Sequence, residues 1–283
     1  MTNFRNDDQL KSYLKNEANR LGISSQNTYS TFFSRLLLER LSRESYDKLY
    51  VKGSFSLITH MPTNGNYSKL IRPVTDIDIV STEYHNDPLI ALYRAVYESN
   101  DDISYELTGL PIQSETGMWK LKVNANFGKI VHPISIDFQE QSNTIYEVAH
   151  QEVKPIFLKD DSFKISTPTV EEHLAEKFCI VVEDVPDGMI NTRVKDFYDI
   201  YKLLGGEYDE EKFIKYFNKM IIDRHKIAED RITSRHLNGD YVKSHQQLWD
   251  NSSKRLEFLD KSVTLDEAVY TTRKVLRNTL NIY

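Results

Sequence analysis

Two aspartates, Asp76 and Asp78, stand one residue apart in the β-rich stretch RPVTDIDIV of residues 72–80. Because side chains alternate between the two faces of a strand, we expect both carboxylates on one face and Ile77 and Ile79 on the other. Strand geometry puts the two aspartate Cβ atoms roughly 6.5 Å apart, where charges in an effective dielectric of about 20 repel by ~2–3 kcal/mol. Such a pair needs water or a cation close by.

A third aspartate, Asp137, alternates with isoleucine in a second β-rich stretch, ISIDFQE. If the two strands are neighbours, three carboxylates converge on one patch, and a divalent cation would turn their repulsion into attraction. Mg²⁺ prefers a few carboxylate oxygens together with substrate phosphates, so Asp76 and Asp78 are predicted to hold Mg²⁺ or Mn²⁺. The alternative is a solvated strand face, on which acidic side chains cost little.

A Gly-Ser pair precedes these acids. Gly53 follows the strand-like segment LYVK, and Ser54 opens a predicted short helix. Glycine permits the tight turn, and the first N–H groups of a helix can bind a phosphate. The serine hydroxyl can add one more hydrogen bond. The alternative is an ordinary helix cap, a position that serine also favours.

Apolar periodicity predicts a mixed α/β fold that ends in helices. The first helix is expected to have Asp7 or Asp8 as its cap and to stop at Gly22. Helices are predicted at residues 7–21, 25–42, 54–60 and 88–99, and strands at residues 49–52, 72–80, 102–110, 118–128 and 130–140. Helical patterns dominate after residue 166. The predicted domains are therefore an α/β domain with N-terminal helices, residues 1–167, and a helical domain, residues 168–283.

The bulk composition favours a soluble protein of the cytoplasm. A single cysteine, Cys179, excludes an internal disulfide framework, and no Cys/His cluster has the spacing of a zinc site. The first residues are too polar for a signal peptide, and no apolar run approaches the roughly 18 residues of a membrane span. The net charge is −6, yet residues 211–283 hold 14 Lys and Arg against 10 Asp and Glu. A polyanion would therefore dock on this tail, although a solvated helical surface would have the same composition.

The strand, the Gly-Ser turn, the helix and the Asp-x-Asp strand together resemble the nucleotidyltransferase superfamily of DNA polymerase β. Within it, the chain looks like the AbiEii/AbiGii toxin family, from about residue 8 to about residue 205. The segments that carry this resemblance are LGISSQNTYSTFFSRLLLERLS, YVKGSFSLITHM with IRPVTDIDIV, ISIDF, and HLAEKFCIVVED with NTRVKDFYDIYKL. The stretch between Ser54 and Asp76 is longer than is usual in the superfamily, and a surface loop would absorb the extra residues.

The resemblance implies a role for each matching residue of the α/β domain. Gly53 and Ser54 would bind the triphosphate, and Asp76 and Asp78 would bind Mg²⁺. Asp137 matches an acid that can activate the attacking hydroxyl in the superfamily.

The resemblance also implies that the helical domain contributes Lys177 and Asp196 to the catalytic site. Lys177 matches a lysine that contacts the nucleotide or the transferring phosphoryl group. Arg193, Asp196 and Asp199 match a late Arg-x-x-Asp-x-x-Asp motif, with Arg193 expected to bind nucleotide. From the residues alone, Lys177 could instead reach solvent at the border of an apolar helix face. The motif residues could likewise form a surface ion pair worth about 0.3 kcal/mol.

These observations predict a Mg²⁺-dependent nucleotidyltransferase that transfers a nucleoside monophosphate (NMP) from an NTP to an acceptor hydroxyl. The resemblance implies a toxin of a toxin–antitoxin or abortive-infection system, with the 3′ end of tRNA as acceptor, a block of translation as the result and an antitoxin encoded nearby. Alternatives are a small-molecule or protein acceptor, or a non-catalytic nucleotide- or RNA-binding module. A nuclease is less favoured, because it would not need the Gly-Ser phosphate turn.

Overall fold

The computed structural model describes residues 4–45, 49–60, 74, 76–81, 88–97, 102–115, 117–140, 146–183, 193–223, 227, 231–255 and 260–283. The chain divides into two compact units, each described here by itself. The first unit holds the described residues of Met1–Thr59 and Ile71–Pro168. The second unit holds those of His60–Leu70 and Thr169–Tyr283.

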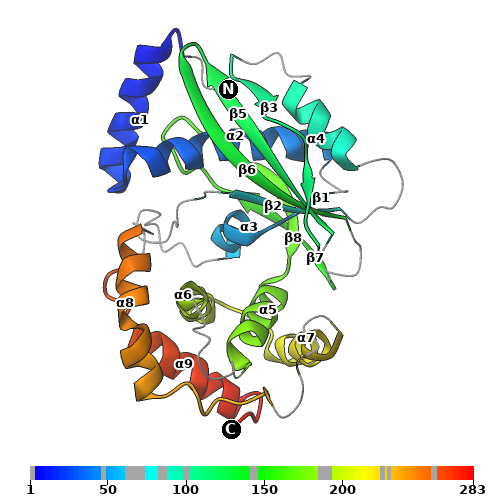
Figure 1. Ribbon diagram of the computed structural model, residues 1–283, viewed down its shortest axis with the longest axis vertical. Coiled ribbons are helices and arrows are strands. Elements are labelled where there is room, and N and C mark those ends of the chain that lie inside the picture. Colours follow the sequence, from blue (N-terminus) through cyan, green and yellow to red (C-terminus); the bar gives the residue numbers. More distant parts are fainter. Residues whose placement is uncertain are drawn as a thin grey trace. The chain divides into compact units, whose positions relative to one another are not determined.

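The first unit is a mixed sheet with helices packed against it (Figure 1). Its helices are α1 (Asp7–Leu21), α2 (Ser25–Ser45), α3 (Gly53–His60) and α4 (Pro88–Tyr97). Its strands are β1 (Leu49–Lys52), β2 (Asp76–Ser81), β3 (Ser104–Leu107), β4 (Ile112–Gln113), β5 (Met118–Phe127), β6 (Ile130–Glu140), β7 (Val148–Val153) and β8 (Phe163–Pro168). The described strands form one sheet in the order β3-β5-β6-β2-β1-β8-β7, with β4 beside β5. The pairs β2–β6 and β1–β8 are parallel, and the other pairs are antiparallel.

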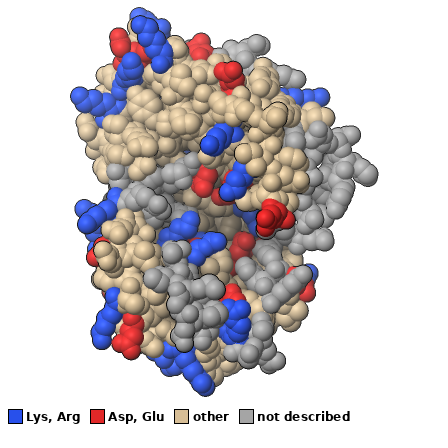
Figure 2. Space-filling view, in the orientation of Figure 1, with Lys and Arg blue, Asp and Glu red and all other residues tan. Residues whose placement is uncertain are grey.

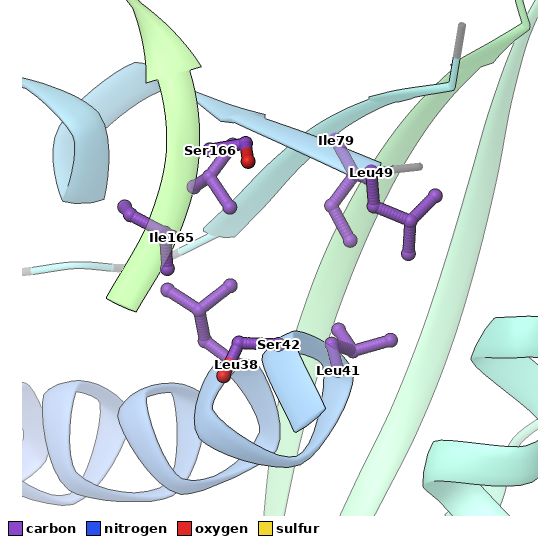
Figure 3. A pocket seen from close by; sticks show the side chains of 8 residues that line it. Leu38, Leu41, Ser42, Leu49, Ile79, Ile165 and Ser166 are labelled. Carbon is purple, nitrogen blue, oxygen red and sulfur yellow. The ribbon is translucent and has the colours of Figure 1, made fainter. Parts of the chain in front are cut away.

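The core of the first unit lies between α2 and the sheet. α2 contacts β2, β6 and β8 and presents fully buried apolar side chains to them. Figure 3 shows a small apolar cavity at this contact, with Leu38 and Leu41 of α2 facing Ile79 of β2 and Ile165 of β8. Because every second residue of β2 faces α2, the alternate residues are left for the opposite face of the sheet.

The predicted elements of the first unit are largely confirmed, with two kinds of error. The cap of α1 is Asn6, whose side chain accepts a hydrogen bond from the Gln9 N–H, so the expectation of Asp7 or Asp8 was wrong. Both aspartates lie in the first turn, where negative charge is favourable, and Gly22 ends the helix as predicted. The strands β4, β7 and β8 were not predicted. Residues 72, 73 and 75 of the predicted strand lie outside the described residues.

The second unit is helical in its described part, as the sequence predicts. Its helices are α5 (Val170–Val182), α6 (Val194–Leu204), α7 (Glu210–Asp223), α8 (Gly239–Arg255) and α9 (Leu265–Asn278). The side chain of Thr169 caps α5, and Thr264 and Glu267 form a reciprocal capping box at the start of α9. Across the described residues of both units, each helix is too short or too polar to cross a membrane.

A buried ion pair fixes the β7–β8 loop of the first unit to α2. Arg35 and Asp160 are each 1% exposed, and the Arg35 Nε lies 2.9 Å from an Asp160 carboxylate oxygen. The same oxygen accepts hydrogen bonds from the backbone N–H groups of Ile156 and Phe157. Burial raises the pKa of Asp160 to about 6, although Arg35 and these N–H groups favour its ionised form. At neutral pH the loop therefore depends on the charge of Arg35.

We predict that Arg35→Leu lowers the free energy of unfolding by about 3–5 kcal/mol at pH 7.5, because it leaves a buried carboxylate without its partner. The loss should shrink as the pH falls to 6 and below, where Asp160 becomes protonated. The control is Arg43→Leu on the same helix, whose half-exposed pair with Glu39 is expected to contribute less than about 1 kcal/mol. Urea denaturation measures both, and equal losses for the two variants would contradict the prediction.

Candidate functional site

The three predicted acids of the first unit share one face of its sheet. β2 and β6 are parallel neighbours, in which Asp78 pairs with Asp137 and Asp76 pairs with Ser135. Residues paired in this way carry their side chains on the same face of a sheet. All three carboxylates are half-buried. The condition for their convergence, that the two strands are neighbours, is therefore met.

Two lysines flank these acids across the sheet. Lys52 of β1 pairs with Asp78, and Lys120 of β5 pairs with Asp137. Neighbouring strands lie about 4.8 Å apart, so a row of positive, negative, negative and positive side chains crosses four strands. Burial raises the pKa of Asp137, the charge of Lys120 lowers it, and the charge of Asp76 raises it. Because the lysines offset part of the mutual repulsion of the acids, that repulsion is weaker than the sequence alone suggests.

Gly53 brings the backbone against the carboxylate of Asp78. Its φ of 62° lies in the left-handed region that favours glycine. A Cβ atom added at Gly53 would lie 1.7 Å from an Asp78 carboxylate oxygen, so no other residue fits without displacing that side chain. α3 begins at this glycine, with the half-buried Ser54 in its first turn. The predicted sequence of strand, glycine turn and helix is confirmed.

The buried side chains of α3 hold its first turn in place. Phe55 and Leu57 are buried in the core, and the hydroxyl of Ser56 makes a buried hydrogen bond with the hydroxyl of Thr167 on β8. A helix anchored in this way presents its first N–H groups at a fixed position beside Gly53. An oxygen ligand at these groups would lie next to the carboxylate of Asp78, because that carboxylate contacts Gly53.

The second unit carries a separate cluster, which we call the Lys177 cluster: Lys177 of α5 with Arg193, Asp196 and Asp199. The Lys177 ammonium nitrogen lies 2.7 Å from a carboxylate oxygen of Asp196 and 2.7 Å from one of Asp199. The two aspartates are 2% and 0% exposed, and Lys177 is 12% exposed. The alternatives of a solvent-directed lysine and a surface ion pair are therefore wrong.

Arg193 occupies the edge of the Lys177 cluster. It is 56% exposed, and its guanidinium lies 3.8 Å from the second carboxylate oxygen of Asp196, which is a long contact for an ion pair. It stands at the N-cap position of α6 without a side-chain capping bond. Its charge nevertheless balances the cluster, which then has two cations and two anions.

The predicted site residues thus form two groups. Gly53, Ser54 and the three acids are together in the first unit, and the Lys177 cluster is in the second. Sequence reasoning missed Lys52 and Lys120, because only the strand register reveals them. Within the described part of the chain, no group of three or more His, Cys, Asp or Glu side chains is arranged to hold a metal ion. The predicted metal ligands are therefore still Asp76 and Asp78, and substrate oxygens would fill the remaining coordination positions of the metal.

Comparison with known proteins places the chain in the class of nucleotidyltransferases. The family of nucleotidyl transferase AbiEii toxins of type IV toxin–antitoxin systems matches residues 35–271. The chain belongs to this family. The match begins later than the predicted resemblance and extends further, through α7, α8 and the first half of α9.

Two solved structures from Helicobacter pylori share the fold. JHP933 is 13% identical with a TM-score of 0.50, and the alignment covers 91% of this chain and 94% of JHP933. A second H. pylori protein, provisionally described as a nucleotidyltransferase, is 14% identical with a TM-score of 0.50. That alignment covers 92% of this chain and 98% of the H. pylori chain. At these identities the similarity concerns the fold alone. Comparison with curated proteins finds no match.

We predict that Gly53→Ala displaces the carboxylate of Asp78 and weakens NTP binding, which calorimetry with Mg²⁺ present would measure. The matched control is Gly22→Ala, where φ is 70° but nothing lies within 4 Å of an added Cβ. Both changes carry the backbone strain of about 1 kcal/mol for a left-handed residue. Gly53→Ala should lower the free energy of unfolding by about 1 kcal/mol more, since a side chain must also move. Equal effects of the two changes on stability and binding would contradict this account.

Proposed function

We propose that this protein transfers an NMP from an NTP to an acceptor hydroxyl and releases pyrophosphate. The observation that carries the proposal is the placement of Asp76, Asp78 and Asp137 on neighbouring strands beside the glycine turn. Membership of the AbiEii family supports it. Within a type IV toxin–antitoxin system the reaction would act as a toxin, and an antitoxin would be the partner. We propose the 3′ end of tRNA as acceptor, so that translation stops in the cytoplasm, where both substrates are found.

The residues of the first unit suit this chemistry. The N–H groups at the start of α3 and the hydroxyl of Ser54 would hold phosphate oxygens. Asp137 would accept the proton of the attacking hydroxyl, a role that its burial favours by raising its pKa. Lys120, beside Asp137, would favour the approach of an anionic acceptor. Water is excluded on one side, because the opposite face of the sheet is the core.

A divalent metal fits the donor set of the first unit. Asp76 and Asp78 offer half-buried carboxylate oxygens, the hard donors that Mg²⁺ and Mn²⁺ prefer, and Asp78 is held against Gly53. The metal would supply charge neutralisation for the triphosphate.

For the second unit, we propose that Lys177, Arg193 and Asp196 act in the same reaction, with Lys177 and Arg193 contacting the nucleotide. This part rests on the family resemblance of the late motif. Lys177→Ala tests it poorly, because it leaves two buried carboxylates without their ammonium partner and would destabilise the fold as well. A substitution that leaves the buried charges of this cluster in place would test the proposed role better.

An acceptor assay tests the proposed function directly. The purified protein is mixed with each of four α-labelled NTPs and total RNA, and the size of the labelled product is recorded. A labelled band of tRNA length supports the proposal. Label found only on protein extract or on an added aminoglycoside would instead favour the alternative acceptors, and the absence of transfer to all of them would favour a non-catalytic binding module.

We predict that Asp76→Asn with Asp78→Asn abolishes transfer and leaves the fold intact, because amides keep the size of the side chains and remove the charge. Catalysis should fall by about three orders of magnitude or more, since the charge stabilisation lost amounts to several kcal/mol at about 1.4 kcal/mol per decade. NTP binding should also lose its dependence on Mg²⁺ in calorimetry with and without EDTA. The control is the exposed Asp102→Asn, which should change neither. A folded double mutant with full toxicity and full transfer would refute the metal site.

We also predict that part of the RNA docks on α7 of the second unit. Lys215 and Lys219 are exposed and stand one helical turn apart, whereas Lys212 is half-buried. Changing Lys215 and Lys219 to Glu should weaken RNA binding. The slope of the logarithm of the RNA association constant against the logarithm of the salt concentration should fall in magnitude by about 1.5, as expected for two lost phosphate contacts. NTP affinity should not change. The control reverses Lys154 and Lys164, which are exposed in the first unit.

Figure 2 shows how charged side chains are distributed on one face of the molecule. On the visible face, Lys and Arg side chains are interspersed with Asp and Glu rather than gathered in one broad basic surface. Local contacts of this kind give a modest salt dependence. An unchanged salt slope in the variant of Lys215 and Lys219 would show that RNA docks elsewhere.

A further inference from the structure

A tyrosine of α8 lies beside the Lys177 cluster, and its hydroxyl is buried. Tyr241 packs edge-on against Phe197 of α6, with ring centroids 5.6 Å apart, and stacks on His245, with centroids 3.9 Å apart. These two contacts hold the ring next to the first turn of α6, where Asp196 lies. Burial and the charge of Asp196 both raise the pKa of Tyr241, so the phenol keeps its proton at physiological pH. It is therefore a hydrogen-bond donor close to a carboxylate.

The two carboxylate oxygens of Asp196 differ in their hydrogen bonding. One carboxylate oxygen accepts a hydrogen bond from Lys177 at 2.7 Å. The other, Oδ2, is buried, and the Arg193 guanidinium lies 3.8 Å from it. Within the described part of the chain, neither Asp196 Oδ2 nor the Tyr241 hydroxyl has a hydrogen-bond partner. A buried donor and a buried acceptor that both lack a partner are rare in folded proteins, because each then loses its hydration without compensation.

We propose that Tyr241 is a positioning residue of the Lys177 cluster, whose hydroxyl holds Asp196 Oδ2 through one buried water. With Lys177 on one oxygen and Tyr241 on the other, the carboxylate has a single orientation, and Lys177 is held in turn. Tyr241 then acts through Asp196 and does not itself touch the reacting atoms. This proposal deepens the proposed function, on which its effect on transfer rests.

The contact can be tested without any transfer activity, by a double-mutant cycle in thermal melting. Tyr241→Phe removes only the hydroxyl, and Asp196→Asn removes the charge that strengthens the hydrogen bond. We expect Tyr241→Phe to lower Tm by about 3 °C in the wild-type background, and by less than half of that beside Asp196→Asn. If the hydroxyl has no partner, removing it leaves Tm unchanged or raises it in both backgrounds, which overturns the proposal.

The matched control is Tyr198→Phe in the same unit. Tyr198 is a buried residue of α6, and its hydroxyl accepts a hydrogen bond from the backbone N–H of Asp260 at 3.2 Å. Tyr198→Phe should lower Tm by the same amount in the wild-type background and in the Asp196→Asn background. It should leave NMP transfer unchanged. A tyrosine that merely packs in the helical unit would behave like this control.

We expect Tyr241→Phe to affect kcat and KM for NMP transfer differently. We expect Tyr241→Phe to lower kcat for NMP transfer by about 10-fold, as for a small misplacement of a catalytic group, with the KM for NTP changed less than about twofold. A kcat equal to that of the wild type overturns the positioning role, and it does so even if Asp196→Asn proves too unstable for the melting cycle. If the wild-type protein transfers no nucleotide to any acceptor while the melting cycle shows coupling, the proposed function fails and the contact between Tyr241 and Asp196 stands.

Discussion

Asp78 and Asp137 face each other because β2 and β6 pair in parallel at one register. The isoleucines on the other face of β2 are buried, and they set that register. A slip by one residue would turn them to solvent and the acids into the core. The same register places Lys52 and Lys120 beside the acids, through pairing that continues across β1 and β5. Hydrophobic packing of the sheet against α2 therefore determines the order of charges on the opposite face.

The acids of the first unit and the Lys177 cluster differ in their exposure to solvent, and therefore in how far each side chain depends on its charged neighbours. The acids of the first unit are half-buried, so solvent reaches them, as the metal and phosphate binding that we propose requires. In the Lys177 cluster the carboxylates of Asp196 and Asp199 are buried, and their charge is balanced mainly from within the protein. Desolvation makes each member of such a cluster depend on the others. The cluster also connects α5 to α6, so it contributes to the fold of the helical unit as well as to the chemistry that we propose.

What the sequence could predict depended on how strongly each element buries one face. α1, β2, β5 and β6 do so, which made the fold class and the acid pair visible as a pattern. Half of the residues of β7 are polar and the strand is largely exposed, and β8 buries Ser166 and Thr167 through hydrogen bonds with His150 and Ser56, so neither strand shows apolar alternation. The flanking lysines and the hydroxyl of Tyr241 could not be predicted, because their neighbours come from segments distant in the sequence.

The interior strand β1 has its two partners at very different distances along the chain. β2 follows it closely, whereas β8, in which Ser166 pairs with Tyr50, comes at the end of the unit. During synthesis β1 therefore keeps one edge unpaired until Pro168 has left the ribosome, and closing that long loop has to overcome chain entropy first. An unpaired strand edge readily accepts a strand from another molecule. Unfinished or truncated chains that end before β8 should thus aggregate, whereas chains that extend past α5 bury that edge within their own sheet.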